Sequence, residues 1–157
     1  MRKRTYYKKK ERVPDHKYDR IDVGLFINYL MWDGKRTVAE HVFYGALDEI
    51  QKRTKDDGVE TFEHAIENVT PLLELVSRRV GGANYQIPRD VRPERKFFLA
   101  SRWIITAARK KKGKPMHERL ADELIAASKN EGEAIKKKQD THRMAEANRA
   151  FASLLRR

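Results

Sequence analysis

Arginine is the residue type in this chain whose position points most directly to a chemical role. A planar guanidinium pairs bidentately with phosphate and stacks on bases, whereas a lysine acts as a flexible point charge. The stretch from residue 78 to residue 109 is rich in such cations, namely Arg78, Arg79, Arg89, Arg92, Arg95, Lys96, Arg102 and Arg109. This concentration predicts a surface that recognises a shaped polyanion.

No pattern in the sequence indicates catalysis, a cofactor or a metal. The five histidines fall singly, without an i,i+4 pair or an acidic residue at ligand spacing. The serines show no nucleophile elbow, and Gly81-Gly82 has neither the GxGxxG nor the GK[ST] context of a phosphate loop. Cysteine is absent, which removes thiolate catalysis and fits a reducing cytoplasm. We therefore expect a binding protein without a cofactor or metal.

The charge is distributed in blocks. The formal net charge is +12, and residues 76–119 carry 13 basic and 3 acidic side chains, whereas residues 21–75 carry 5 basic and 11 acidic ones. Residues 1–20 are again basic and contain few apolar side chains. This alternation predicts one face for a polyanion and another for water or protein.

The arginines need elements that position them, and the first is a β-hairpin over residues 72–91. Gly81 and Gly82 can both adopt the positive φ of a tight primed turn, so the flanking runs can fold back on each other. The register then pairs Arg78 with Tyr85, Val76 with Ile87 and Glu74 with Arg89. A polar two-stranded ribbon is marginal alone. We therefore expect a helical body behind it, and we expect that body to fold without residues 77–88.

Apolar periodicity predicts about six helices. They cover approximately residues 22–31, 37–53, 59–69, 93–109, 115–129 and 133–154. Asp22 is the expected N-cap of the first helix, and residues 37–40 have capping-box spacing. In the fourth helix Arg95, Arg102 and Arg109 are seven residues apart and form one stripe. The fold class is thus mainly α, a single domain (residues 1–157) with a basic arm (1–20) and a hairpin arm (72–91) between the third and fourth helices.

No apolar run reaches the roughly 20 residues that a membrane span needs. The N-terminus lacks the apolar segment of a signal peptide. We expect a cytoplasmic protein that does not bind membranes.

Several collinear motifs resemble the family of ribosomal protein seven of the bacterial small subunit. They are Val13-Pro14-Asp15, Leu30-Met31-Trp32-Asp33-Gly34-Lys35, Ser77-Arg78-Arg79-Val80-Gly81-Gly82, Tyr85-Gln86-Ile87-Pro88, Val91-Arg92-Pro93, Leu99-Ala100-Ser101-Arg102-Trp103, Ala107-Ala108-Arg109 and His142-Arg143-Met144-Ala145-Glu146-Ala147-Asn148. The resemblance spans nearly the whole chain. Three positions depart from it: Thr70 stands where the family usually has arginine, and Phe97 and Phe98 replace smaller or more polar residues.

The resemblance implies a primary binding protein for the 3′ major domain of small-subunit rRNA that nucleates assembly of the subunit head. It implies a ribosome-bound position near the exit site for tRNA and the mRNA path, beside small-subunit ribosomal proteins nine and eleven, and no independent homo-oligomer. The residues proposed to bind RNA are Arg2, Lys3, Arg4, Lys8, Lys9, Lys10, Lys35, Arg36, Arg78, Arg79, Gly81, Gly82, Tyr85, Arg92, Arg95, Lys96, Arg102, Arg109, Lys110, Lys111, Lys112, Lys114 and Arg143.

Two alternatives come from other classes. A DNA-bending protein with a basic β-ribbon arm would share the charge and the hairpin, but such arms usually carry an apolar wedge at the tip, and Val80 is a weak one. An RNA-modifying enzyme would need a cofactor loop or a catalytic constellation, and neither pattern is found.

Overall fold

Six α-helices and one antiparallel hairpin make up residues 12–156, the part of the chain described by this computed structural model. The helices are α1 (Ile21–Leu30), α2 (Arg36–Thr54), α3 (Gly58–Val69), α4 (Pro93–Lys110), α5 (Met116–Ser128) and α6 (Glu133–Ala147). Strands β1 (Leu73–Val80) and β2 (Ala83–Asp90) lie between α3 and α4, and the 3₁₀ segment η1 (Arg149–Arg156) follows α6. The predicted fold class is confirmed.

The helix ends show where local sequence rules apply. The Asp57 side chain accepts a hydrogen bond from the Val59 backbone N–H at 3.1 Å and caps α3. Pro93 opens α4, as expected for a residue that tolerates the first helical turn. The capping expected elsewhere is wrong. Asp22 lies inside the first turn of α1, and Glu40 pairs with Arg36 at 2.8 Å instead of closing a capping box.

The core is built from aromatic rings and small residues. The rings of Phe26, Phe43 and Phe62 lie 5.1–5.3 Å apart, mostly edge to face, and all three are fully buried. Burying each such side chain contributes about 1.5–3 kcal/mol. Helix α5 packs against α2, α3 and α4, and its buried Ala121 and Ala127 allow close approach. The core therefore fixes α4, the arginine-rich helix.

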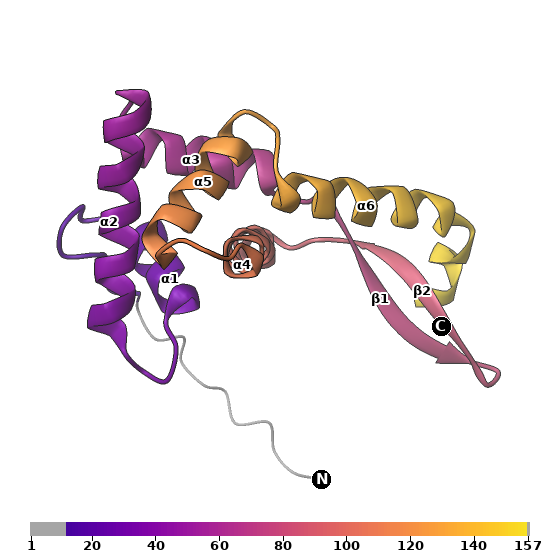
Figure 1. Ribbon diagram of the computed structural model, residues 1–157. Coiled ribbons are helices and arrows are strands. Elements are labelled where there is room, and N and C mark those ends of the chain that lie inside the picture. Colours follow the sequence, from indigo (N-terminus) through magenta and orange to yellow (C-terminus); the bar gives the residue numbers. More distant parts are fainter. Residues whose placement is uncertain (1–11, 157) are drawn as a thin grey trace, which may run out of the picture.

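The hairpin projects from this helical body, with its base against α6 (Figure 1). Its register agrees with the predicted one, including Arg78 opposite Tyr85 and Glu74 opposite Arg89. Gly81 and Gly82 have φ values of +56° and +90°, which glycine adopts without strain. The base is embedded, because Ile87 is fully buried and Glu74 is 6% exposed. A cut through residues 77–88 would thus remove a core side chain, and only the distal part of the arm is free of the core.

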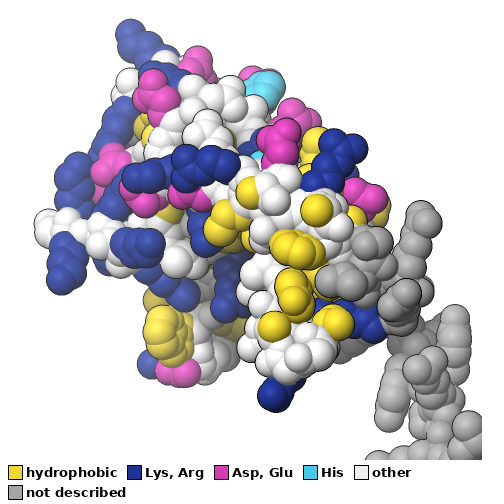
Figure 2. Space-filling model, turned by 90° about the vertical axis from the view of Figure 1, so that its right-hand side faces the viewer, with side chains coloured by type: hydrophobic (Ala, Val, Ile, Leu, Met, Phe, Trp, Pro, Cys, Tyr) yellow, Lys and Arg dark blue, Asp and Glu magenta, His cyan; other side chains and the backbone are white. Residues whose placement is uncertain are grey.

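The C-terminal region departs from the single helix expected up to residue 154. Helix α6 ends at Ala147, and η1 turns back toward the hairpin, where the Phe151 and Tyr85 rings lie 5.1 Å apart (Figure 1). Figure 2 looks onto this side of the molecule and shows hydrophobic side chains lying in the open. Met144 and Phe151 are among the exposed large hydrophobic residues.

Candidate nucleic-acid interface

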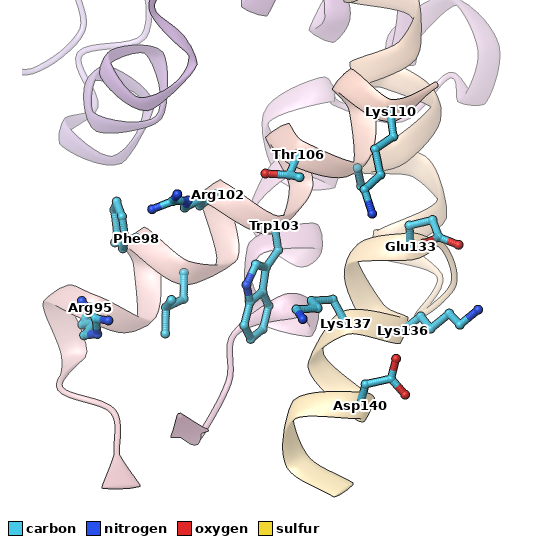
Figure 3. Close-up of a pocket in the computed structure, with 12 residues that line it drawn as sticks. Arg95, Phe98, Arg102, Trp103, Thr106, Lys110, Glu133, Lys136, Lys137 and Asp140 are labelled. Carbon is cyan, nitrogen blue, oxygen red and sulfur yellow. The ribbon is translucent and has the colours of Figure 1, made fainter. Parts of the chain in front are cut away.

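A groove of about 610 Å³ lies between α4 and α6 and combines cations with aromatic side chains. Phe98, Leu99, Trp103 and Ala107 supply apolar lining from α4. The Trp103 indole points from α4 into the space between the helices, toward Lys137 (Figure 3). The cations around it come from both helices and are Arg95, Arg102, Lys110, Lys136 and Lys137. Such a surface can pair with phosphates and offer faces on which unpaired bases stack.

The predicted arginine stripe of α4 exists, but its three members have different neighbours. Arg95 donates from Nε to the buried Glu74 Oε2 at 2.5 Å. Because arginine has five N–H donors, its terminal nitrogens remain for an anion. The Arg102 guanidinium lies 5.8 Å from the Phe98 ring. Arg109 donates from Nη2 to the Leu30 carbonyl at 2.9 Å and therefore also holds the end of α1.

The hairpin carries its cations away from the body. Arg79 and the Gly81-Gly82 tip are exposed, whereas Arg78 is half-buried. Tyr85 is half-buried because its ring packs on Phe151. Of these arm residues, Arg79 and the glycines are the most accessible to a large ligand.

Four lysines lie at the end of α4 and in the loop after it, at positions 110, 111, 112 and 114, and they differ in their contacts. Lys111 Nζ lies 2.7 Å from Oε2 of Glu123, a fully buried carboxylate, and Lys114 Nζ lies 3.3 Å from Asp122 Oδ2. Lys110 and Lys112 are exposed. Lys111 is therefore held by a buried partner, whereas Lys110, Lys112 and Lys114 are exposed.

The remaining predicted residues are scattered. Lys35 directly precedes α2 and Arg36 begins it, and Arg109 reaches the same region through Leu30. The Arg92 carbonyl accepts from the Lys96 N–H at 2.9 Å at the start of α4. Arg143 pairs with Asp140 at 2.7 Å on α6. Arg2, Lys3, Arg4, Lys8, Lys9 and Lys10 lie outside the described residues.

Comparison with known proteins shows the family of this chain. The model of the family described as ribosomal protein S7p/S5e matches residues 1–149. The chain belongs to this family. It is 55% identical to the small ribosomal subunit protein uS7 of Thermotoga maritima over 97% of both chains. It is also 55% identical to the uS7 protein of Magnetococcus marinus over 97% of both chains, and 51% identical to that of a Caulobacter strain, K31, over 97% of this chain and 98% of the relative.

As an S7p/S5e family member, the chain is a non-enzymatic structural constituent of the small ribosomal subunit and acts in translation. Within residues 12–156, none of the helices has the length and apolar character needed to cross a membrane.

Two lysines of the groove, Lys136 and Lys137, are not among the residues that the sequence predicts to bind RNA. Lys136 and Lys137 are exposed in the first turns of α6, where the helix dipole disfavours cations. This unfavourable placement is a signal in the sequence for a binding site, because a nearby anion would offset the repulsion between the lysines and the helix dipole. The sequence does not show that α6 lies beside α4 and brings these lysines to the groove that Arg102 also lines.

Lys138, the third lysine of this run, faces the protein instead. Its Nζ donates to the Asn68 carbonyl at 2.6 Å, and burial lowers its pKa. Burial, together with the nearby Lys138 charge, also lowers the pKa of His142, whose Nε2 accepts from the Leu72 N–H at 3.2 Å. These contacts join α6 to the end of α3 and the root of the hairpin.

Asp15, His16 and Glu40 form a cluster that the sequence pattern missed, with one potential ligand atom of each within 4.8 Å of the others. The buried Asp15 carboxylate is already engaged, however. Its Oδ1 accepts from the Tyr44 hydroxyl at 2.8 Å, and Oδ2 accepts from the Lys17 and Tyr18 backbone N–H groups at 3.1 and 3.2 Å. The cluster anchors the segment before α1 to α2 and gives no support to a metal site.

Proposed function

We propose that this subunit constituent is a primary rRNA-binding protein that binds the 3′ major domain of small-subunit rRNA and nucleates assembly of the head. The α4–α6 groove is the observation that carries this proposal. Arg95, Arg102 and Lys110 of α4 and Lys136 and Lys137 of α6 line it together with Phe98 and Trp103, so phosphates and unpaired bases can be bound on one surface. Core packing holds α4 rigidly, which lowers the entropic cost of binding.

Salt dependence is the first measurable consequence. If about 6–10 phosphates are neutralised, affinity for an rRNA fragment should fall by roughly 10³–10⁵ between low and moderate salt. A binding constant that does not change with salt would contradict the proposal.

The groove itself is tested by filter binding of a Lys136→Ala/Lys137→Ala variant to a fragment of the 3′ major domain. Losing two phosphate contacts should weaken binding about tenfold or more and reduce the salt slope by about 2. The matched control is Lys52→Ala/Lys129→Ala, which removes the same charge from exposed positions outside the groove. Equal losses in the two variants would show that net charge, and not the groove, determines binding.

In this proposal the whole chain, residues 1–157, acts as one ribosome-bound cytoplasmic domain without forming its own homo-oligomer. The hairpin reaches the tRNA exit site near the mRNA path, and the body contacts small-subunit ribosomal proteins nine and eleven. Replacing Arg78, Arg79 and Tyr85 with alanine should hardly change rRNA affinity. It should speed dissociation of exit-site tRNA from reconstituted subunits. Loss of rRNA binding in this arm variant would contradict the assignment of the hairpin to the exit site and of rRNA binding to the body.

The DNA-bending alternative receives little support from the arm. Its tip consists of two glycines, and Val80 beside them is only 36% exposed. A wedge that opens a base step needs a larger apolar side chain at the end of the arm. Competition between the rRNA fragment and duplex DNA separates the alternatives, since the proposal requires preference for rRNA.

A further inference from the structure

Trp32 is an exposed tryptophan on the surface between α1 and α2. The residue is 65% exposed, and the Arg109 guanidinium lies 4.9 Å from the ring centroid. Arg109 cannot swing away freely, because its Nη2 also donates to the Leu30 carbonyl at 2.9 Å. With an arginine against one face and most of its surface in solvent, the indole presents its other face outward.

An apolar groove of about 260 Å³ opens beside this indole. Leu30, Val38, Val42 and Met116 line it together with Trp32, and Val38 is itself 57% exposed. Single exposed hydrophobic residues are common and do not by themselves indicate a binding site. Here, however, the exposed Trp32 and Val38 both line the groove, so together they form a contiguous hydrophobic patch.

The charges around the groove indicate which kind of ligand fits it. Lys35 lines it, Arg36 follows at the start of α2, and the first turn of that helix contains no acidic residue. The nearby Glu40 is paired with Arg36 at 2.8 Å. Cations at the beginning of a helix oppose its dipole, which a bound anion would relieve. An apolar groove with an indole beside it and cations at its rim matches a nucleotide, which has a flat base attached to a phosphate.

We propose that Trp32 is a stacking site for one unpaired RNA base, with the adjoining phosphates at Lys35 and Arg36. This inference rests on the rRNA-binding function proposed above and assigns to it a second contact region, outside the α4–α6 groove. A base inside a duplex has no free face to offer, so the occupant is a looped-out or single-stranded nucleotide. Stacking on an aromatic ring tolerates any base, so the site adds affinity and not sequence choice.

The test compares Trp32→Leu, which keeps apolar bulk but has no π-face, with Trp32→Phe, which keeps a smaller ring. On the 3′ major domain fragment, Trp32→Leu should bind about 5- to 150-fold more weakly than the unaltered chain, and Trp32→Phe should recover part of that loss. Because Trp32 is exposed, neither change should disturb the fold, and circular dichroism checks this.

Fluorescence gives an independent readout. A short oligoadenylate should quench the emission of the unaltered chain, and the part of the quenching due to Trp32 should be missing in Trp32→Leu. An abasic oligomer of the same length tests the phosphate contacts alone, and it should not quench Trp32.

The outcomes separate the two proposals. If the unaltered chain fails to bind the rRNA fragment, the proposed function fails. If that chain binds but Trp32→Leu binds equally well and quenching is unchanged, only the stacking site is overturned. If Trp32 stays accessible to acrylamide in the rRNA complex and becomes protected only in the assembled subunit, its occupant is a protein and the inference is wrong.

Discussion

Glu74 Oε2 accepts a hydrogen bond from Arg95 Nε at 2.5 Å, and this contact joins the first strand of the hairpin to α4. The other carboxylate oxygen accepts from Arg89 Nη2 at 2.7 Å, across the two strands. The Glu74 side chain is 8% exposed, whereas the side chains of Arg89 and Arg95 are 46% and 49% exposed. One buried carboxylate thus organises two arginines that remain open to an anion.

Glu74→Gln should lower the free energy of unfolding by about 1–3 kcal/mol, because the amide weakens hydrogen bonds to both arginines and leaves them less well paired. Urea unfolding measures this loss. Asp48→Asn, an exposed substitution on α2, is the matched control and should change stability by less than about 0.5 kcal/mol. A variant as stable as the control would show that Glu74 does not hold the hairpin base.

The same carboxylate makes stability depend on pH. Burial by itself raises the pKa of Glu74, but hydrogen bonds from Arg95 and Arg89 outweigh it and lower the pKa below its usual value. A lowered pKa in the folded state contributes stability above the pKa of the unfolded chain, and that stability is lost as pH falls through the folded value. The difference in unfolding free energy between the unaltered chain and Glu74→Gln should therefore shrink on acidification in this range. A difference that is independent of pH would rule out this coupling.

Arg102→Ala and Lys111→Ala should separate RNA binding from stability. Arg102 is exposed and lines the α4–α6 groove, so its loss should weaken rRNA binding and leave unfolding nearly unchanged. Lys111 compensates the buried Glu123, so its removal should cost up to about 3 kcal/mol of stability. Filter binding and urea unfolding of both variants test this, and the reverse pattern would show that the groove is misplaced.

Shortening the arm should spare the fold if Ile87 is kept. Joining Val76 to Ile87, which are directly opposed, through an Asn-Gly turn keeps the embedded base. Cooperative thermal unfolding and helical circular dichroism should persist. Ile87→Ala in the full-length chain should instead cost about 2–5 kcal/mol, because it leaves a cavity at a fully buried position. A shortened chain that unfolds without cooperativity would mean that the distal arm belongs to the core.

The sequence was sufficient for features determined by neighbouring residues. Two glycines specify a tight turn, and alternation then determines that Arg78 faces Tyr85, so the hairpin register could be predicted. The helix boundary at Pro93 likewise depends on the geometry of proline alone.

Features that depend on packing between distant elements could not be predicted in this way. The cations at positions 95, 109 and 111 look alike in the sequence. Only the tertiary structure brings Arg95 to Glu74, Arg109 to Leu30 and Lys111 to Glu123. For the same reason, the end of α6 at Ala147 went unrecognised, since the turn there serves a contact between Phe151 and Tyr85.

That contact changes the mechanics of the arm. A hairpin attached to the body only at its base would bend easily toward its tip. The Phe151 ring lies 5.1 Å from the Tyr85 ring, part-way along the ribbon, so a shorter part of the arm is free to bend. The stiffness of the arm, and hence the precision with which its glycine tip is positioned, therefore depends on η1 as well as on the strands themselves.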